Sequence, residues 1–308
     1  MTTLLVHRPG MLTTVQDLGR WGNQRFGIPV GGPMDLFAHR YANALVANAD
    51  SAAALEITLM GPELETDRPA VCAVTGARFE VTVNGVVVPL DMAVEIPAGG
   101  RLRFGARGSG ARAALAVRGG FDVPPLYGSR ATSLLGRMGP FEGRALRAGD
   151  ALRVGDAPAR HTVVTASAGM ALPEGGTRLR VIAGPQADRF EPGALEALYG
   201  GRFIVTPQSN RTGYRLDGPL LRHADEGDIL SDATPIGSLQ VPASGQPILL
   251  MADRQTTGGY PKIATVISAD LPLAGQLAPG DWIEFVAVTR AEAVAALKRQ
   301  QAQLEPRP

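Results

Sequence analysis

The chain has 308 residues, of which 45% are hydrophobic and 19% charged, values typical of a soluble globular protein. Its formal net charge of +1 provides no field that would attract nucleic acid or an anionic membrane, so a nucleic-acid role is disfavoured. Cys72 is the single cysteine, which rules out an internal disulfide and indicates a reducing compartment. With no leader-like start and no apolar run of membrane length, the sequence predicts a cytoplasmic protein.

The first predicted element in chain order is a helix that follows the glycine-rich residues 27–32. Pro33 lies near its first turn, Asp35 supplies an acidic N-terminus, and Phe37 and Tyr41 share one apolar face. Glycines allow close approach of a ligand, and a helix N-terminus favours an anion. The residues before this helix are therefore a candidate anion site, with a simple well-capped loop as the alternative.

Residues 79–88 form the clearest predicted hairpin, because Asn84-Gly85 separates two apolar or alternating runs. The 38 glycines and 24 prolines supply many further turns between short runs. Strands at this spacing favour barrels or sandwiches over a parallel doubly wound sheet. Other strands are predicted at residues 92–96, 101–105, 112–118, 178–183, 202–206, 248–252, 263–267 and 281–288.

Two more helices are predicted in the second half of the chain. One covers residues 187–199 and ends at a pair of glycines. The other begins at Thr289, which forms a capping box with Glu292, and is expected to bury Val294 and Leu297. Helices are thus a minority in a mainly β protein.

A weak internal echo suggests two related halves. Residues 146–154 resemble residues 277–285, and in each a Gly-Asp turn leads into an alternating strand. Two β-rich domains would explain both the spacing and the length. The predicted division is residues 1–155, residues 156–288 and a C-terminal helix and tail at 289–308, with a boundary near 156 that strand exchange would shift.

Polar side chains gather in residues 253–262, directly after an apolar run. Of the 30 basic residues only Lys262 and Lys298 are lysines, and Lys298 lies in a polar C-terminal segment. Lysine is a compact charge that responds to burial, whereas arginine is a fixed planar fork. The segment therefore predicts a site built around Lys262. The alternative is a polar hairpin turn with a surface lysine.

Two other stretches are unusually polar for their apolar flanks. Residues 13–22 contain Asp17 and run into the glycine-rich segment described above. In residues 207–216, Arg211 and Arg215 are suited to hold a carboxylate or phosphate, because guanidinium matches such groups bidentately. The alternative is that these arginines form structural ion pairs, with Asp217 or Asp225 as partners.

Several common signatures are missing from the sequence. It has no P-loop and no Gly-x-Ser-x-Gly elbow, which disfavours a P-loop nucleotide site and a serine hydrolase. Neither lysine lies beside a methionine, so no covalent biotin is expected on this chain. No metal site is predicted, because the histidines lack ligand spacing; they are His7, His39, His161 and His223.

Several segments together carry a resemblance to a known family. They are residues 14–20, 31–35, 118–124, 128–130, 207–215 and 253–262. Over roughly residues 3–288 the chain resembles the biotin-dependent carboxyltransferase family, also called allophanate hydrolase subunit 2. Bacterial single-chain members of this family form the C subunit of ATP-dependent 5-oxoprolinase. Asn23 and Thr212 depart from the family's usual pattern.

The resemblance implies two cyclophilin-like β-barrel domains and a site that is completed by a partner of related fold, the oxoprolinase B subunit, with the A subunit beside it. It implies ATP as cofactor, with Mg²⁺, and the opening of 5-oxoproline to glutamate. Two alternatives stay open. One is transfer of a carboxyl group from carboxybiotin to urea or a similar amide, and the other is a non-catalytic regulatory protein that antagonises a kinase inhibitor.

The enzyme interpretation assigns a role to each polar segment, because a planar amide must be activated by charge stabilisation or by group transfer. Lys262 and the N–H groups of Gly258 and Gly259 would stabilise the developing charge, and Asp253 would be the base. Arg211 or Arg215 would hold the substrate carboxylate. We expect Asp17, Arg211 and residues 253–262 to converge. The remaining expected substrate-binding residues are Asn210, Tyr214, Gln255, Thr256, Thr257 and Tyr260.

Overall fold

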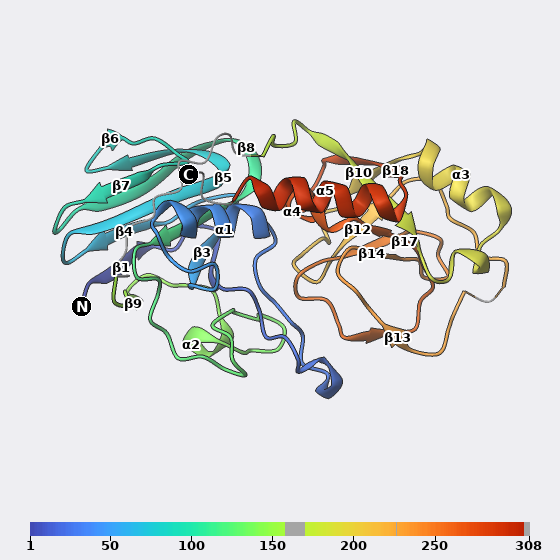
Figure 1. Ribbon diagram of the computed structural model, residues 1–308, viewed down its shortest axis with the longest axis horizontal. Helices are drawn as coiled ribbons and strands as arrows, with labels where there is room; N and C mark the ends of the chain where they lie inside the picture. Colours follow the sequence, from blue (N-terminus) through green and yellow to red (C-terminus); the bar gives the residue numbers. More distant parts are fainter. Residues whose placement is uncertain (158–169, 226, 305–308) are drawn as a thin grey trace. The chain divides into compact units, whose positions relative to one another are not determined.

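The computed structural model describes residues 1–157, 170–225 and 227–304, so His161 lies outside the described residues. The chain forms two compact units (Figure 1). Unit 1 comprises Met1–Trp21, Gly31–Leu172 and Gln301–Pro308, and unit 2 comprises Gly22–Val30 and Pro173–Gln300. Each unit is built mainly of β-strands, as the sequence predicts.

Unit 1 is a strongly curved antiparallel sheet. Its strand order is β2-β3-β8-β4-β1-β9, and β5 pairs with β8 while carrying the hairpin strands β6 and β7. The long strands β5 and β8 run side by side through this sheet (Figure 1). The strands are β1 (Thr3–Arg8), β2 (Leu12–Gln16), β3 (Ala54–Thr58), β4 (Glu63–Thr66), β5 (Ala70–Val83), β6 (Val86–Val87), β7 (Ala93–Ile96), β8 (Arg101–Val117) and β9 (Ala151–Arg153).

Strand β8 differs from the two separate strands predicted at 101–105 and 112–118. The chain stays paired with β5 through Arg107 and Ser109, although the register shifts between Gly76 and Val81. These irregularities are β-bulges, which bend a strand without ending it. The glycines at 105, 108 and 110 therefore mark a bend rather than a turn.

Local signals at the N-terminal half are confirmed. Asn84 and Gly85 both have positive φ angles, +52° and +82°, and they join β5 to β6 as a tight hairpin. The first helix, α1 (Leu36–Leu45), begins after Asp35, whose Oδ1 accepts a hydrogen bond from the N–H of Ala38 at 2.8 Å. This cap satisfies one free donor of the first turn. A short helix, α2 (Pro140–Gly143), follows later in unit 1.

Helix α1 packs its apolar face on the sheet. Phe37 and Tyr41 are 6% and 3% exposed and lie in one cluster with alanines of β3, β5 and β8. Small alanines allow the helix to approach the strands closely. The other face of the sheet covers a larger apolar core with Leu4, Leu55 and Leu115.

Unit 2 is a closed barrel with the strand order β10-β17-β14-β15-β12-β11-β18. Every strand therefore has two neighbours, which removes the unpaired edges of an open sheet. Strands β13 and β16 form a separate two-stranded ribbon that is not part of the barrel sheet; Figure 1 labels β13. The strands are β10 (Gly176–Ala183), β11 (Arg202–Val205), β12 (Gly213–Asp217), β13 (Asp232–Ala233), β14 (Ser238–Gln240), β15 (Ile248–Leu250), β16 (Thr257–Gly258), β17 (Lys262–Val266) and β18 (Trp282–Ala287).

The helix predicted over residues 187–199 is broken into two pieces. A 3₁₀ turn, η2 (Ala187–Arg189), is followed by α3 (Pro192–Gly200), and Glu191 between them is extended. Proline disfavours the helical conformation of the residue before it, so Pro192 starts a new helix rather than continuing one. Two short 3₁₀ turns and one short helix also belong to unit 2: η1 (Gln24–Phe26), η3 (Ser268–Asp270) and α4 (Leu271–Gly275).

The last helix, α5 (Arg290–Ala302), begins with the predicted capping box. Glu292 N–H donates to Thr289 Oγ1 at 3.2 Å, and Thr289 N–H donates to Glu292 Oε2 at 2.8 Å. The expected burial of Val294 is wrong, because that side chain is 46% exposed and Ala296 faces the barrel instead. The packed face carries Ala293 and Ala296, one position before the predicted Val294 and Leu297.

The internal echo is reproduced in local geometry but not in topology. Asp150 Oδ2 accepts from Arg147 N–H at 2.7 Å, and Asp281 Oδ2 accepts from Ala278 N–H at 2.8 Å. Each turn leads into a strand, β9 or β18. However, β9 pairs with β1 only, whereas β18 closes the barrel between β10 and β11. The same turn motif is thus used in two different sheets.

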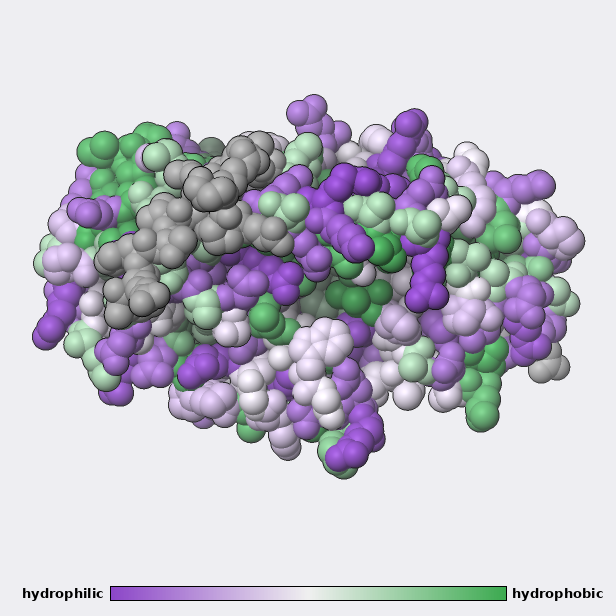
Figure 2. Space-filling model, viewed as in Figure 1, coloured by the Kyte–Doolittle hydropathy of each residue, from purple (hydrophilic) through white to green (hydrophobic). Residues whose placement is uncertain are grey.

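Apolar side chains are exposed around the β6 hairpin of unit 1. Val86, Val87 and Met92 are 69%, 65% and 56% exposed, and Figure 2 shows apolar atoms gathered at that end of the unit. Among the described residues, no helix is long and apolar enough to span a membrane.

Candidate functional site

Lys262 is buried in the wall of the barrel, at the start of β17. Its residue is 1% exposed, although a lysine side chain is normally solvated. Its Nζ lies 2.8 Å from Asp232 Oδ2, and the Asp232 side chain is 48% exposed. The ammonium therefore lies just inside the surface and the carboxylate just outside it.

Gln186 ties the two partners together. Its Oε1 accepts from the backbone N–H of Lys262 at 3.2 Å, and its Nε2 donates to Asp232 Oδ2 at 3.3 Å. Asp232 Oδ1 accepts from the N–H of Ala233 at 2.7 Å. The hydrogen bond from Lys262 is the main cause that lowers the pKa of Asp232, with the Ala233 N–H second. Asp232 is thus held as a carboxylate above a buried cation.

Asp232 reaches Lys262 because the ribbon folds back over the barrel. Asp232 pairs with Gly258 across β13 and β16, and Ile229 N–H donates to Gly259 O at 2.8 Å. Arg254 Nε donates to Thr234 O at 2.6 Å, which fastens the far end of β13. The predicted oxyanion donors Gly258 and Gly259 therefore lie in the ribbon that covers Lys262.

A buried amide extends the polar cluster below the ribbon. Gln240 is 1% exposed; its Oε1 accepts from Gln255 Nε2 at 3.0 Å, and its Nε2 donates to Tyr260 O at 3.3 Å. A Cβ added to Gly258 would lie 2.7 Å from Gln240 Nε2. A side chain at 258 would therefore displace the end of this amide.

The rim of the cluster is formed by other predicted residues. Tyr260 is 41% exposed, and Thr257 and Gln255 are also exposed, while Thr256 is half-buried. Thr256 O accepts from Thr234 N–H at 3.2 Å. The structure thus places Gln255, Thr256, Thr257 and Tyr260 near the part of the barrel wall in which Lys262 is buried.

Arg211 and Asp253 are paired with each other. Arg211 Nε and Nη2 donate to Asp253 Oδ2 and Oδ1 at 3.0 Å and 3.1 Å, and both residues are at most 4% exposed. The alternative partners Asp217 and Asp225 are not used; Asp225 pairs with Arg189 at 2.7 Å. Arg211 and Asp253 thus form a buried ion pair, and the roles of Asp253 as base and Arg211 as carboxylate anchor stay predictions.

Three further predicted residues near Arg211 occupy positions that sequence reasoning did not foresee. Tyr214 is 1% exposed, with its hydroxyl 3.5 Å from Leu277 O, so its side chain packs in the barrel core. Asn210 Oδ1 accepts from Thr212 N–H at 2.8 Å and caps a turn. Arg215 has an exposed side chain on β12.

Asp17 belongs to unit 1, and it is 6% exposed. Oδ1 accepts from Gly19 N–H at 2.9 Å and from the Ser129 hydroxyl at 2.5 Å, and Oδ2 accepts from Arg130 N–H at 2.5 Å. These bonds order the Gly128-Ser129-Arg130 motif. That Asp17 converges with Lys262 stays a prediction.

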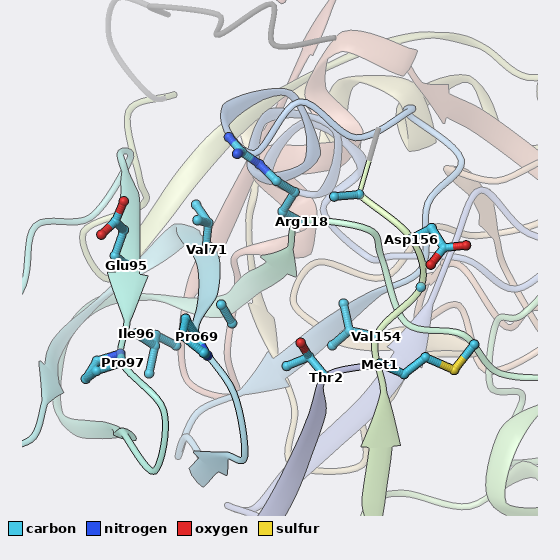
Figure 3. A pocket seen from close by; sticks show the side chains of 13 residues that line it. Met1, Thr2, Pro69, Val71, Glu95, Ile96, Pro97, Arg118, Val154 and Asp156 are labelled. Carbon is cyan, nitrogen blue, oxygen red and sulfur yellow. The ribbon is translucent and has the colours of Figure 1, made fainter. Parts of the chain in front are cut away.

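A hollow of about 780 Å³ lies elsewhere in unit 1. Its walls include Glu95 and Asp156 on opposite sides, with Arg118 between them (Figure 3). None of the predicted site residues lines it. Large volume alone therefore does not mark the site that the polar motifs predict.

Sequence reasoning missed Asp232, Gln186 and Gln240. Each lies in a loop or short strand far along the chain from Lys262 and carries no motif. The one usable signal was the rarity of lysine, since a buried ammonium requires an anionic partner. Among the described residues, no group of three or more His, Cys, Asp or Glu side chains is arranged to hold a metal ion.

Comparison with known proteins identifies the family. Residues 26–287 match the family described as carboxyltransferase domain, subdomain A and B. The chain belongs to this carboxyltransferase family. It is 40% identical to the 5-oxoprolinase C subunit of Escherichia coli (strain K12), over 98% of this chain and 96% of that protein.

Larger family members contain a region similar to this chain as one part. Urea amidolyase of Saccharomyces cerevisiae is 33% identical over 97% of this chain, which spans 17% of that protein. The solved urea amidolyase of K. lactis superposes with a TM-score of 0.93 at 32% identity, over 98% of this chain and 20% of that one. The fold of this chain therefore also occurs within longer proteins.

Proposed function

We propose that this chain is the C subunit of a 5-oxoprolinase, which opens the lactam ring of 5-oxoproline to glutamate with ATP. The observation that carries the proposal is the end-to-end match to the E. coli protein of that name, 96% of whose length is covered. The Haemophilus influenzae protein of the same name is 36% identical over 93% of its length.

The site supports a role in amide chemistry. A lactam is a planar amide, so attack at its carbonyl or transfer of a phosphoryl group to its oxygen places negative charge on atoms that were neutral. A buried ammonium at Lys262, under a polar rim, is suited to neutralise such charge because low water content strengthens the interaction. In this proposal Lys262 supplies the positive charge of the site, and the rim residues Gln255, Thr257 and Tyr260 contact the substrate.

Action within a complex is part of the proposal. ATP with Mg²⁺ would bind to the partner or to the assembled complex, since this chain has no P-loop. The exposed apolar side chains Val86, Val87 and Met92 support a heteromeric state, because contiguous exposed apolar surface commonly marks protein contacts. We therefore propose the A and B subunits of the oxoprolinase as partners in the cytoplasm.

Reconstitution tests this function. The chain is purified alone, the two proposed partners are purified separately, and 5-oxoproline-dependent ATP hydrolysis and glutamate release are measured for each and for the mixture. The expected result is negligible turnover by this chain alone and full turnover by the complex. Full turnover by this chain alone, or none by the complex, would contradict the proposal.

The urea amidolyase similarity gives a second candidate, a carboxyltransferase component that moves carboxyl from carboxybiotin to urea or a similar amide. It is favoured by the TM-score of 0.93, but the chain spans only 20% of that protein. Turnover that requires added carboxybiotin, and that avidin blocks, would identify this activity instead.

A further inference from the structure

Lys262 and Asp232 occupy very different environments although they form one ion pair. The lysine side chain is 2% exposed and the aspartate side chain 48% exposed. Leu230, two residues before Asp232, is 94% exposed, and β13 itself has only two residues. The anion is therefore carried by the short two-stranded ribbon, and the cation by the barrel wall.

This asymmetry decides what can replace Asp232. A half-exposed carboxylate that leaves the pair is hydrated again, so the free-energy cost of separating it from the pair is small. A buried ammonium left without a partner is an uncompensated charge, which is strongly unfavourable. Only another anion can take the place of Asp232 without that cost.

The surroundings of the pair select a compact anion with hydrogen-bond acceptors. Gln186 Nε2 is a second donor aimed at the same carboxylate oxygen, 3.3 Å away. Lys262 Nζ and Gln186 Nε2 can both donate hydrogen bonds to one oxygen of a carboxylate. Neither has the wide, planar set of donors of an arginine. Thr257 and Tyr260 are exposed at the rim, where their hydroxyl groups are available for polar contacts to the rest of a small molecule.

We infer that Asp232 is a built-in stand-in for a ligand carboxylate, and that Lys262 with Gln186 forms the subsite which the carboxylate of a small amide occupies when the ribbon moves aside. The inference deepens the proposed function and rests on it, because the lactam in that proposal bears a carboxylate. Asp232 then competes with the ligand for one ammonium. If Asp232 occupies the subsite about nine-tenths of the time, the apparent Kd is about tenfold above its intrinsic value.

The test is binding to the full chain at pH 7, measured by calorimetry without ATP or partner. Probes are 5-oxoproline, the neutral lactam 2-pyrrolidinone and inorganic phosphate. Asp232→Asn should tighten 5-oxoproline by about tenfold and leave 2-pyrrolidinone unchanged. Asp225→Asn is the matched control: it removes an equally charged, similarly exposed aspartate of the same unit and should change neither affinity.

Lys262→Met supplies a second test that does not depend on the folding of the Asp232 variant. It should abolish the preference for 5-oxoproline over 2-pyrrolidinone, since the ammonium is gone. Unchanged or weakened 5-oxoproline binding by Asp232→Asn would overturn the inference, as would tighter phosphate binding alone. Loss of oxoprolinase turnover in the reconstitution, with the binding shifts intact, would remove the proposed function and keep the subsite.

Discussion

Arg211 and Asp253 join two loops of the barrel through both their side chains and their backbones. The side chains form two hydrogen bonds of 3.0 Å and 3.1 Å, and the N–H of Asp253 donates to Arg211 O at 2.9 Å. The pair lies where β15 ends and where β12 is about to begin. It therefore orders the chain that leads from β15 toward the ribbon and Lys262.

Arg211→Ala should destabilise the chain by about 3–5 kcal/mol, because it leaves the Asp253 carboxylate buried without its counterion. The free energy of unfolding in urea is the measurement. Arg189→Ala is the control, since Arg189 forms an exposed pair with Asp225 that is expected to contribute at most about 1 kcal/mol. Equal effects of the two substitutions would refute a structural role for the Arg211 pair.

Lys262→Ala should lower kcat/KM of the reconstituted complex by about 100-fold or more, because the site loses the positive charge that it offers to the substrate. Lys262→Arg should not restore kcat/KM, because the site is buried and closed by Asp232 and Gln186, so a wide guanidinium has no room. Lys298→Ala, which removes the other lysine from an exposed position on α5, is the control. If the arginine variant keeps a near wild-type kcat/KM, then Lys262 supplies only positive charge, and its specific catalytic role is wrong.

Gly258→Ala should lower kcat with little loss of stability. The new methyl group would meet Gln240 Nε2 at 2.7 Å, so the buried amide must turn away from Tyr260 O and the ribbon must shift. Gly193→Ala on α3 is the control, since no atom lies within 4 Å of its added methyl group. Kinetics of the complex and thermal unfolding of the chain are compared; an unchanged kcat for Gly258→Ala would show that the ribbon position is not critical.

Acid should destabilise unit 1 through His39. Burial lowers the pKa of this histidine from 6.5 to about 4, although Asp17 opposes the shift. Below pH 6.5 the unfolded chain binds a proton that the folded chain refuses, so stability is lost as the pH falls from 6.5 toward 4, by about 3 kcal/mol in total. His39→Gln should flatten this part of the stability curve relative to the wild type. An unchanged slope in the His39→Gln variant would contradict this cause.

The predicted convergence of Asp17 with the Lys262 region can be measured as a distance. Spin labels replace Trp21, which is 62% exposed and close to Asp17 in the chain, and Tyr260, which is 41% exposed. Convergence predicts a separation on the order of 20 Å, whereas labels on opposite faces of units of this size would be on the order of 30 Å or more apart. The larger separation would remove Asp17 from the site.

Local structure could be predicted wherever the decisive interactions lie within a few residues. The Asn84-Gly85 hairpin, the Asp35 cap and the Thr289–Glu292 capping box depend on neighbouring backbone groups, and all are present. The helix predicted over residues 187–199 is interrupted before Pro192, because proline disfavours the helical conformation of the residue that precedes it. The importance of residues 253–262 likewise followed from composition alone, through the rarity of lysine.

Pairing between distant side chains was decided only by the tertiary structure. Asp232 meets Lys262 from 30 residues away, and Asp253 meets Arg211 from 42 residues away. The sequence around an aspartate does not distinguish a base from a structural counterion or from a group that occupies a ligand's place. Sequence determined that this chain is a β-rich carboxyltransferase-family protein with a lysine-centred polar segment. Which carboxylate faces which cation depends on barrel closure and strand register, which bring together groups that no local pattern links.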